Sequence, residues 1–310
     1  MIEKKEEENE MKIRYIALAL CVSFGVLTGC STSPQDKVQS EQEIVQQEAI
    51  EETKNIVTVT VAATQVMDKM GVDLVGIPTT KQVLPTRYEG VTQVGQVTSP
   101  DFEVIASLEP DLVIIDSMFQ ESMQQGLNEF GMEAFYFDTS TYTRFLQSIE
   151  EIGSVLGKEE EALRLIEELN KVEEVVKSKQ EGEAPTVAIL FGGSENFMLA
   201  TDQSYIGDLV NVAGAHNITD DLKVASDYIP FSIEQMVASN PDYILRFAHG
   251  NLEETTKAFD EAFDKNPAFA TLDAVKEGKV FDLDPTVFGV SANIHAVDAI
   301  TVLGNLLYGE

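Results

Sequence analysis

Histidine is the side chain of this 310-residue sequence best suited to bind a metal ion, and the sequence contains three. His249 ends the stretch ILRFAHG, in which an apolar run typical of a buried strand stops at this histidine and Gly250. In open α/β sheets, ligands bind outside the carboxyl ends of the strands. His249 is therefore a candidate metal ligand, with a purely structural role as the alternative.

The other two histidines are weaker candidates. His216, in VAGAHN, follows a helix end at Gly214, where an imidazole commonly caps backbone carbonyls. His295, in SANIHAVDAI, is expected at the start of the last helix and reaches a cleft only if that helix points inward. Three scattered histidines do not supply the converging ligands that a zinc or manganese receptor needs.

The N-terminus carries the features of an export signal. A basic segment precedes the uncharged apolar run of residues 16–27, which is about half as long as the ~20 residues of a transmembrane helix. Leu-Thr-Gly-Cys30 then resembles a bacterial lipobox, in which Cys30 receives a lipid such as palmitate and becomes the mature N-terminus. We expect residues 1–30 to be a lipoprotein signal peptide that starts at Met1 or at Met11.

Cysteine usage and charge agree with an exported, membrane-anchored domain. Both cysteines lie in the signal, so the mature domain has no thiol for a disulfide or a thiolate metal site. Residues 31–55 are polar and acidic, as in a flexible tether. A net charge of −32 repels phosphate backbones, so we expect no nucleic-acid partner. We expect the protein on the extracellular face of the cell membrane, held by its lipid.

Strands and helices alternate on both sides of one long helical stretch. Apolar runs such as NIVTVTV (55–61), PDLVIID and TVAILFG are typical of strands, and segments of helical periodicity separate them. This alternation predicts an α/β fold with parallel sheets, and the length suits two lobes. We expect an N-terminal lobe over 56–153, a connecting helix over 154–184 with a break near Gly157, and a C-terminal lobe over 185–310.

A short repeat supports the division into two lobes. Glu103 and Glu234 each begin a segment of helical pattern, and a Pro-Asp pair follows seven residues later, at Pro110 and Pro241. An apolar strand follows each pair. The repeat therefore predicts two lobes of similar structure.

The signal, the tether and the paired lobes together resemble the substrate-binding proteins of ATP-driven importers, in the group that carries siderophores, cobalamin and haem. The resemblance covers nearly all of residues 56–310. It implies two Rossmann-like lobes joined by a single long helix, with the ligand cleft between them. The segments most similar to the Gram-positive haem-receptor lipoproteins of this group are VGIPTT, LPTRYEGVTQVG, LATDQSYIGDLVNVAG, ILRFAHG and FGVSAN.

The resemblance also implies a function. A protein of this kind, expected to be a monomer, takes haem from an upstream surface donor and delivers it to an ABC permease and its ATPase for iron uptake. A siderophore or cobalamin receptor on the same scaffold is the alternative. The sequence has no G-x-S-x-G, P-loop, H-E-x-x-H or dinucleotide-binding motif, so we expect no enzymatic activity.

The resemblance implies that His249 is an axial ligand of haem iron, which accepts imidazole, thioether, thiolate or phenolate groups. The family's second ligand is a methionine just ahead of the Pro-Asp-x-Glu segment. This chain has Thr98 there, in VGQVTSPDFE, and a threonine hydroxyl is a poor ligand for haem iron. The resemblance therefore does not identify the second ligand.

Met118 is the candidate for that second ligand. It stands eight residues after Pro110, as His249 stands eight residues after Pro241, so the two should end equivalent strands and face each other across the cleft. Met123 is close enough to compete, and Met118 could instead pack on the porphyrin or in the core. The remaining alternatives opposite His249 are no protein ligand, a water molecule, or a tyrosine such as Tyr88 or Tyr205.

A porphyrin also needs apolar contacts and hydrogen-bond donors for its propionates. Arg87 and Arg246 are candidate propionate partners, since a guanidinium can grip a carboxylate through two hydrogen bonds. The apolar candidates, each of which could equally be a core residue, are Val83, Leu84, Tyr88, Phe119, Phe231 and Phe288.

Glu103 and Glu234 match the family positions at which a glutamate on each lobe meets basic residues of the permease. Exposed paired carboxylates would orient docking and speed the encounter more than they add affinity. The alternative is a pair of solvated glutamates at helix N-termini, where the helix dipole favours negative charge.

Overall fold

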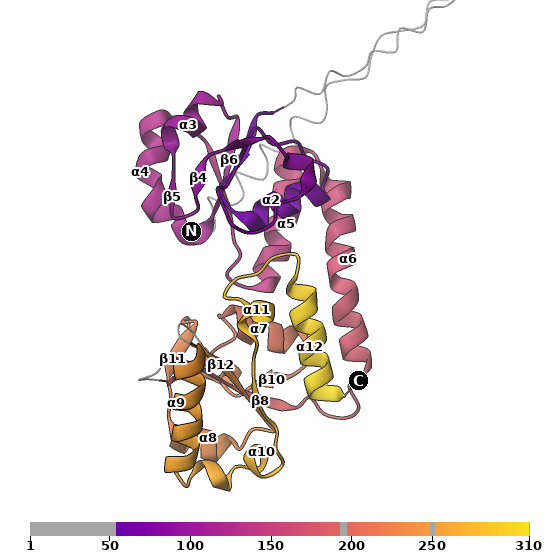
Figure 1. Ribbon diagram of the computed structural model, residues 1–310. Helices are drawn as coiled ribbons and strands as arrows, with labels where there is room; N and C mark the ends of the chain where they lie inside the picture. Colours follow the sequence, from indigo (N-terminus) through magenta and orange to yellow (C-terminus); the bar gives the residue numbers. More distant parts are fainter. Residues whose placement is uncertain (1–53, 193–196, 249–251, 310) are drawn as a thin grey trace, which may run out of the picture. The chain divides into compact units, whose positions relative to one another are not determined.

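The computed structural model describes residues 54–192, 197–248 and 252–309, which form two α/β lobes (Figure 1). Each lobe has its own sheet flanked by helices, and the predicted fold class is therefore confirmed. The expected signal peptide with Cys30, most of the tether, and His249 lie outside the described residues.

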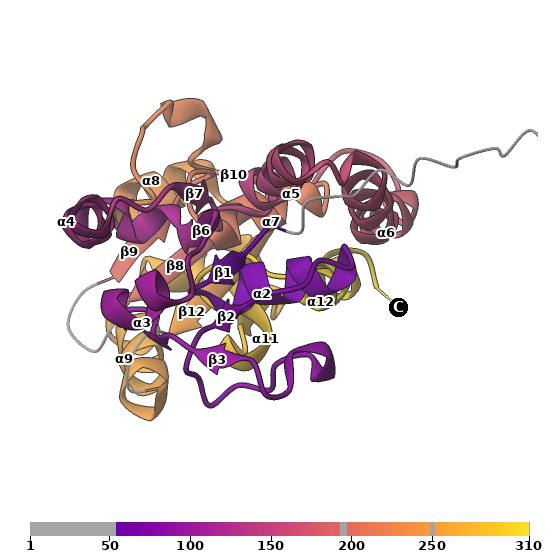
Figure 2. The same cartoon turned by 90° about the horizontal axis from the view of Figure 1, so that it is seen from above.

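The N-terminal lobe contains a fully parallel sheet with the strand order β3-β2-β1-β6-β7. Its strands are β1 (Ile56–Thr58), β2 (Gly76–Ile77), β3 (Thr92–Gln93), β6 (Leu112–Asp116) and β7 (Ala134–Phe137). A small antiparallel pair is formed by β4 (Gly95–Gln96) and β5 (Ser99–Pro100). Its helices are α2 (Val61–Lys69), α3 (Phe102–Ser107), α4 (Gln120–Phe130) and α5 (Tyr142–Leu156). Figure 2 shows α2 next to β1, the central strand.

The C-terminal lobe contains a mixed sheet with the order β11-β9-β8-β12-β13, and β10 also pairs with β8. β8, β10, β12 and β13 are parallel, whereas β9 and β11 run antiparallel to their neighbours. The strands are β8 (Thr186–Gly192), β9 (Phe197–Ala200), β10 (His216–Asn217), β11 (Tyr228–Pro230), β12 (Tyr243–Ala248) and β13 (Val280–Asp282). The helices are α7 (Tyr205–Val212), α8 (Ile233–Ser239), α9 (Leu252–Lys265), α10 (Asp273–Lys276), α11 (Pro285–Phe288) and α12 (Ala296–Tyr308).

The first strand is shorter than the sequence predicts, because a helix cap interrupts it. β1 ends at Thr58 instead of continuing to residue 61, and α2 begins at Val61. The Thr60 backbone is extended, and its side-chain oxygen accepts a hydrogen bond from the Ala63 amide at 3.2 Å. The N-terminus of α2 therefore lies directly at the carboxyl end of β1.

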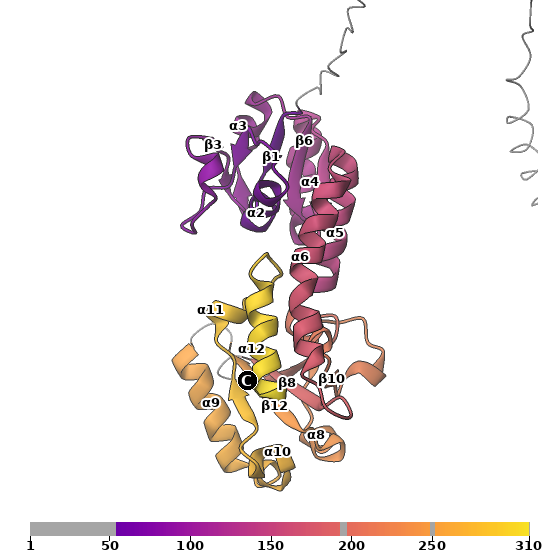
Figure 3. The same cartoon turned by 90° about the vertical axis from the view of Figure 1, so that its right-hand side faces the viewer.

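A sharp turn at Gly157 separates α5 from the next helix of the chain. α5 ends before Gly157, whose φ of 65° lies in the left-handed region that favours glycine. α6 (Glu159–Ser178) then runs for 20 residues, about 30 Å at the usual rise per residue. Figure 3 shows α6 alongside α5 and α12. A Cβ on Gly304 of α12 would lie 2.6 Å from a Val176 methyl, so this close approach requires glycine.

The sequence repeat corresponds to equivalent structure in the two lobes. α3 and α8 have Asp101 and Ser232 as their N-caps, so Glu103 and Glu234 both occupy the second helical position. β6 and β12 each begin two residues after the proline of their Pro-Asp pair. Both are interior strands of their sheets. The repeated motif therefore builds the same helix-strand unit twice.

Within residues 54–192, 197–248 and 252–309, no helix combines the length and the apolar character that spanning a membrane needs.

One carboxylate of the C-terminal lobe caps a helix of the N-terminal lobe. Asp208, in the first turn of α7, accepts hydrogen bonds from the amide and the hydroxyl of Thr143, both at 2.9 Å. Thr143 lies in the first turn of α5, whose own cap is Thr141. Burial raises the pKa of the Asp208 carboxyl, and the hydrogen bonds from Thr143 lower it in part. The contact joins the lobes beside the start of α5.

We expect Asp208→Ala to lower the free energy of unfolding by about 0.5–2 kcal/mol, the usual range for a lost capping side chain. Urea denaturation of the purified chain measures this change. The control is Asp221→Ala, an exposed acid of the same lobe, which should change stability by less than about 0.5 kcal/mol. Equal effects of the two substitutions would contradict the capping role.

The same contact predicts a pH dependence. Because the pKa of Asp208 is raised in the folded state, the folded chain holds this proton more tightly than the unfolded chain does. Its contribution to stability is complete below the unfolded pKa, about 3.9, and is lost as pH rises through the folded pKa. Relative to the native chain, Asp208→Asn should therefore gain stability between pH 4 and pH 7, and a loss over that range would contradict this assignment.

Candidate ligand-binding site

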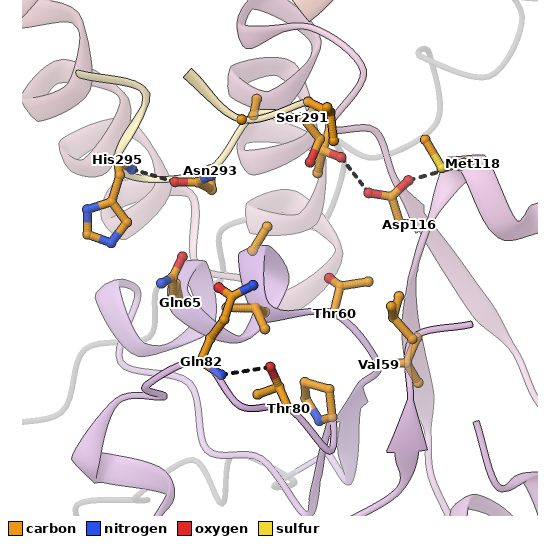
Figure 4. A pocket seen from close by; sticks show the side chains of 18 of the residues that line it. Val59, Thr60, Gln65, Thr80, Gln82, Asp116, Met118, Ser291, Asn293 and His295 are labelled. Carbon is orange, nitrogen blue, oxygen red and sulfur yellow. Dashed lines mark hydrogen bonds between the residues drawn. The ribbon is translucent and has the colours of Figure 1, made fainter. Parts of the chain in front are cut away.

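A cavity of about 1140 Å³ is lined by residues of both lobes (Figure 4). Its volume is slightly above the ~300–1,000 Å³ typical of small-molecule sites. The lining residues of the N-terminal lobe are 59–62, Gln65, 78–82, 96–98, Asp116, Met118, Phe119 and Thr139. Those of the C-terminal lobe are 286–293, His295 and Asp298.

The N-terminal half of the cavity is built from the carboxyl ends of parallel strands. Val59 follows β1, Pro78 follows β2, Asp116 ends β6, and Thr139 follows β7 by two residues. Parallel pairing places all four ends at the same edge of the sheet, where α/β proteins bind their ligands. The opposite wall is the segment that joins α11 to α12.

The cavity wall combines neutral polar groups with apolar ones. The charged side chains among the described lining residues are Lys81, Asp116 and Asp298. Figure 4 shows Gln65, Gln82 and His295 toward one end of the cavity, and Asp116 and Met118 toward the other. Such a wall suits a ligand that has both an extended apolar surface and polar groups.

Met118 lies in the cavity wall, at the end of β6. It sits in the short 3₁₀ turn Ser117–Phe119 at the end of β6, and 72% of its surface is exposed. Its competitor Met123 is on α4, is 2% exposed and packs in the core of the N-terminal lobe. Of these two methionines, Met118 is exposed at the cavity and Met123 is buried outside its lining. Thr98 also lines the cavity.

Asp116 holds the turn that carries Met118. Its Oδ1 accepts a hydrogen bond from the Met118 amide at 2.9 Å, and its Oδ2 accepts one from the Thr139 hydroxyl at 2.5 Å. Burial raises the pKa of the Asp116 carboxyl, and these two hydrogen bonds oppose that shift.

The two predicted propionate partners lie outside the cavity lining. Arg87 donates to the Gly71 carbonyl and to Asp73, at 2.9 Å and 2.7 Å. Arg246 binds Asp260 at 2.8 Å and Asp282 through two nitrogens, and it stacks on the rings of Phe259 and Phe263. Each guanidinium is thus engaged by carboxylates of its own lobe.

The aromatic candidates divide between cavity and core. Phe119 and Phe288 line the cavity, and Phe288 is 2% exposed. Tyr88 is buried instead, and its hydroxyl donates to the Val72 carbonyl at 2.7 Å. The candidates outside the lining are Tyr88, Tyr205, Val83, Leu84 and Phe231.

Sequence reasoning underrated some residues of the cavity. His295 is the N-cap of α12 and lines the cavity, so this helix does point inward. Its amide donates to the Asn293 side chain at 2.8 Å, and its Nδ1 lies 3.8 Å from Asp298. Gln65 was missed; its Oε1 is buried without a hydrogen-bond partner among the described residues. The position of Gln65 one turn into a helix that starts at a strand end is the signal that could have found it.

The other two histidines of the chain are His216 and His249. His216 is on β10, lies outside the cavity lining and has its Nδ1 3.1 Å from Asp220. His249 lies outside the described residues, directly after the end of β12 at Ala248. Within the part of the chain that the structure describes, no group of three or more His, Cys, Asp or Glu is placed to hold a metal ion.

Known proteins share both the sequence and this architecture. The chain is 33% identical to the high-affinity heme uptake system protein IsdE of Staphylococcus aureus, over 96% of this chain and 98% of that protein. A crystal structure of S. aureus IsdE complexed with heme has 35% identity and a TM-score of 0.66, and covers 82% of this chain and 99% of its own. An ABC transporter substrate-binding protein from Listeria monocytogenes has 36% identity and a TM-score of 0.73, with coverages of 84% and 100%.

The sequence profile of the periplasmic binding proteins matches residues 56–287, which is most of the described chain. Two α/β lobes, with the cavity at the strand ends of the N-terminal lobe, agree with this match. The protein therefore belongs to the periplasmic binding protein family, as a substrate-binding protein of an ABC transporter and not an enzyme.

Proposed function

We propose that this chain captures haem in the cavity between its lobes and delivers it to an ABC permease for iron uptake. The observation that carries the proposal is Met118, whose thioether is exposed in the wall of a cavity of about 1140 Å³. A thioether is one of the few protein groups that bind haem iron. The identity of 33% to a protein named for heme uptake supports the same ligand.

His249 is the proposed ligand opposite Met118. It directly follows β12, the counterpart in the repeat of the strand that leads to Met118. Imidazole and thioether together form a coordination pair known for haem iron. Phe119 and Phe288, both in the cavity lining, are the proposed contacts of the porphyrin faces.

A siderophore or cobalamin is the second candidate ligand. Hydroxyl and amide groups are frequent in the cavity wall, and they can bind the polar groups of a siderophore without an iron ligand from the protein. The lining residues of this kind include Thr60, Gln65, Thr79, Thr80, Gln82, Gln96, Thr98 and Asn293.

The proposed N-terminal signal accounts for how the protein is held at the membrane. Residues 1–30 act as a lipoprotein signal, and lipidated Cys30 holds the chain at the extracellular face through the tether 31–55. The lobes over 56–153 and 185–310, linked by the helical region 154–184, form the haem-binding unit. It acts as a monomer and receives haem from a surface donor protein.

We expect the purified chain to develop a Soret band when it is titrated with hemin. His249→Ala should weaken haem binding at least about tenfold, which corresponds to about 1.4 kcal/mol. Absorbance titration measures both quantities. A flat visible spectrum from the folded native chain would reject haem as the ligand, and an unchanged affinity in the variant would reject His249 as ligand.

The second ligand is tested by a matched pair of substitutions. Met118→Leu removes an exposed thioether from the cavity, whereas Met123→Leu removes a buried one outside it, and both approximately conserve volume. We expect Met118→Leu alone to shift the α band of the reduced haem complex. A shift in Met123→Leu alone would transfer the role to Met123.

Docking to the permease is the role proposed for Glu103 and Glu234, which are exposed at the same helical position in the two lobes. We expect the charge reversals Glu103→Arg and Glu234→Arg to reduce stimulation of the reconstituted permease ATPase severalfold, with unchanged ligand affinity. Glu160→Arg is the matched control, because Glu160 is exposed at the second position of α6. An equal reduction in the control would show a general charge effect instead of docking.

A further inference from the structure

The Met118 side chain is exposed, yet its backbone is firmly held. The 3₁₀ turn that contains it has three residues, Ser117–Phe119, between the end of β6 and the start of α4. A turn this short has few backbone hydrogen bonds of its own, so its direction depends on capping. The side-chain cap is Asp116, whose Oδ1 accepts from the Met118 amide at 2.9 Å.

The second oxygen of Asp116 extends this contact toward the other lobe. Oδ2 accepts from the Thr139 hydroxyl, and the Thr139 carbonyl accepts a hydrogen bond from the Ala292 amide at 2.8 Å. Ala292 is fully buried in the cavity wall of the C-terminal lobe. A continuous set of contacts thus runs from Met118 through Asp116 and Thr139 to the opposite wall.

We propose that Asp116 is a positioning residue that aims Met118 into the cavity and couples its position to the wall of the C-terminal lobe. This inference rests on the proposed function in one respect only, namely that Met118 contacts the bound ligand. Asp116 acts through the backbone that it holds, since Oδ1 accepts from the Met118 amide and Oδ2 accepts from the Thr139 hydroxyl.

The ligand-free chain tests the positioning directly. Labelling methionine methyl groups with ¹³C gives one NMR signal for each methionine, and the Met118→Leu spectrum identifies the Met118 signal by its loss. We expect this signal to shift and broaden in Asp116→Ala. Asp101→Ala is the matched control, since Asp101 caps α3 through the Val104 amide at 3.1 Å but lies outside the cavity lining.

Two milder substitutions keep the test valid if Asp116→Ala does not fold. Thr139→Val removes only the hydroxyl that donates to Oδ2, and we expect a smaller shift of the Met118 signal in the same direction. Asp116→Asn keeps an oxygen that can accept from the Met118 amide, so it should restore most of the native signal position. An unchanged Met118 signal in Asp116→Ala, or in Thr139→Val where Asp116→Ala does not fold, overturns the proposal.

Spectra of the haem complex distinguish a failure of this inference from a failure of the proposed function. In the haem complex, Asp116→Ala should move the reduced α band in the same direction as Met118→Leu does. If the chain binds no haem but the methyl signal responds as expected, only the proposed ligand fails. If Met118→Leu alters the haem spectrum and Asp116→Ala alters neither spectrum nor signal, Asp116 is not the positioning residue.

Discussion

Parallel pairing of β1 with β2 and β6 is the constraint on which the site depends. Because these strands and β7 all run in one direction, each of them leaves the sheet at the same edge. Each exit delivers a different segment to the cavity, from the cap Thr60 to the turn at Met118. Backbone pairing in the sheet core therefore determines which side chains meet, although they are far apart in the chain.

The sequence repeat and the alternation of strand and helix patterns made much of this architecture predictable. Alternating apolar runs and helical periodicity identified most of the N-terminal lobe, and the spacing from Pro110 placed Met118 at a strand end. The antiparallel strands β9 and β11 were not predicted, because their pairing depends on partners distant in sequence. Local sequence patterns identify the interior strands of a parallel sheet better than its edge strands, because nearly every residue of an interior strand is apolar.

The interaction partners of charged side chains were less predictable from the sequence than the helices and strands. Arg87 and Arg246 have the chemistry for a propionate, but each meets carboxylates that come from other parts of its own lobe. The sequence shows the guanidinium donor, but it does not show the carboxylates that the tertiary structure brings next to it. At His295, the direction of α12, which packs on α6, brings to the cavity a side chain that the sequence ranks low.

The turn Ser117–Phe119 also shows which part of the cavity wall can change in sequence without loss of the fold. Met118 is mostly exposed and buries little apolar area, so its replacement costs little folding stability. Position 98 lies in a loop next to the small β4–β5 pair, again away from the main sheet. Substitutions in these two loops can therefore change the cavity lining while β1, β6 and their helices stay unchanged. The side chains of the cavity wall and those of the sheet core can thus change at different rates during evolution.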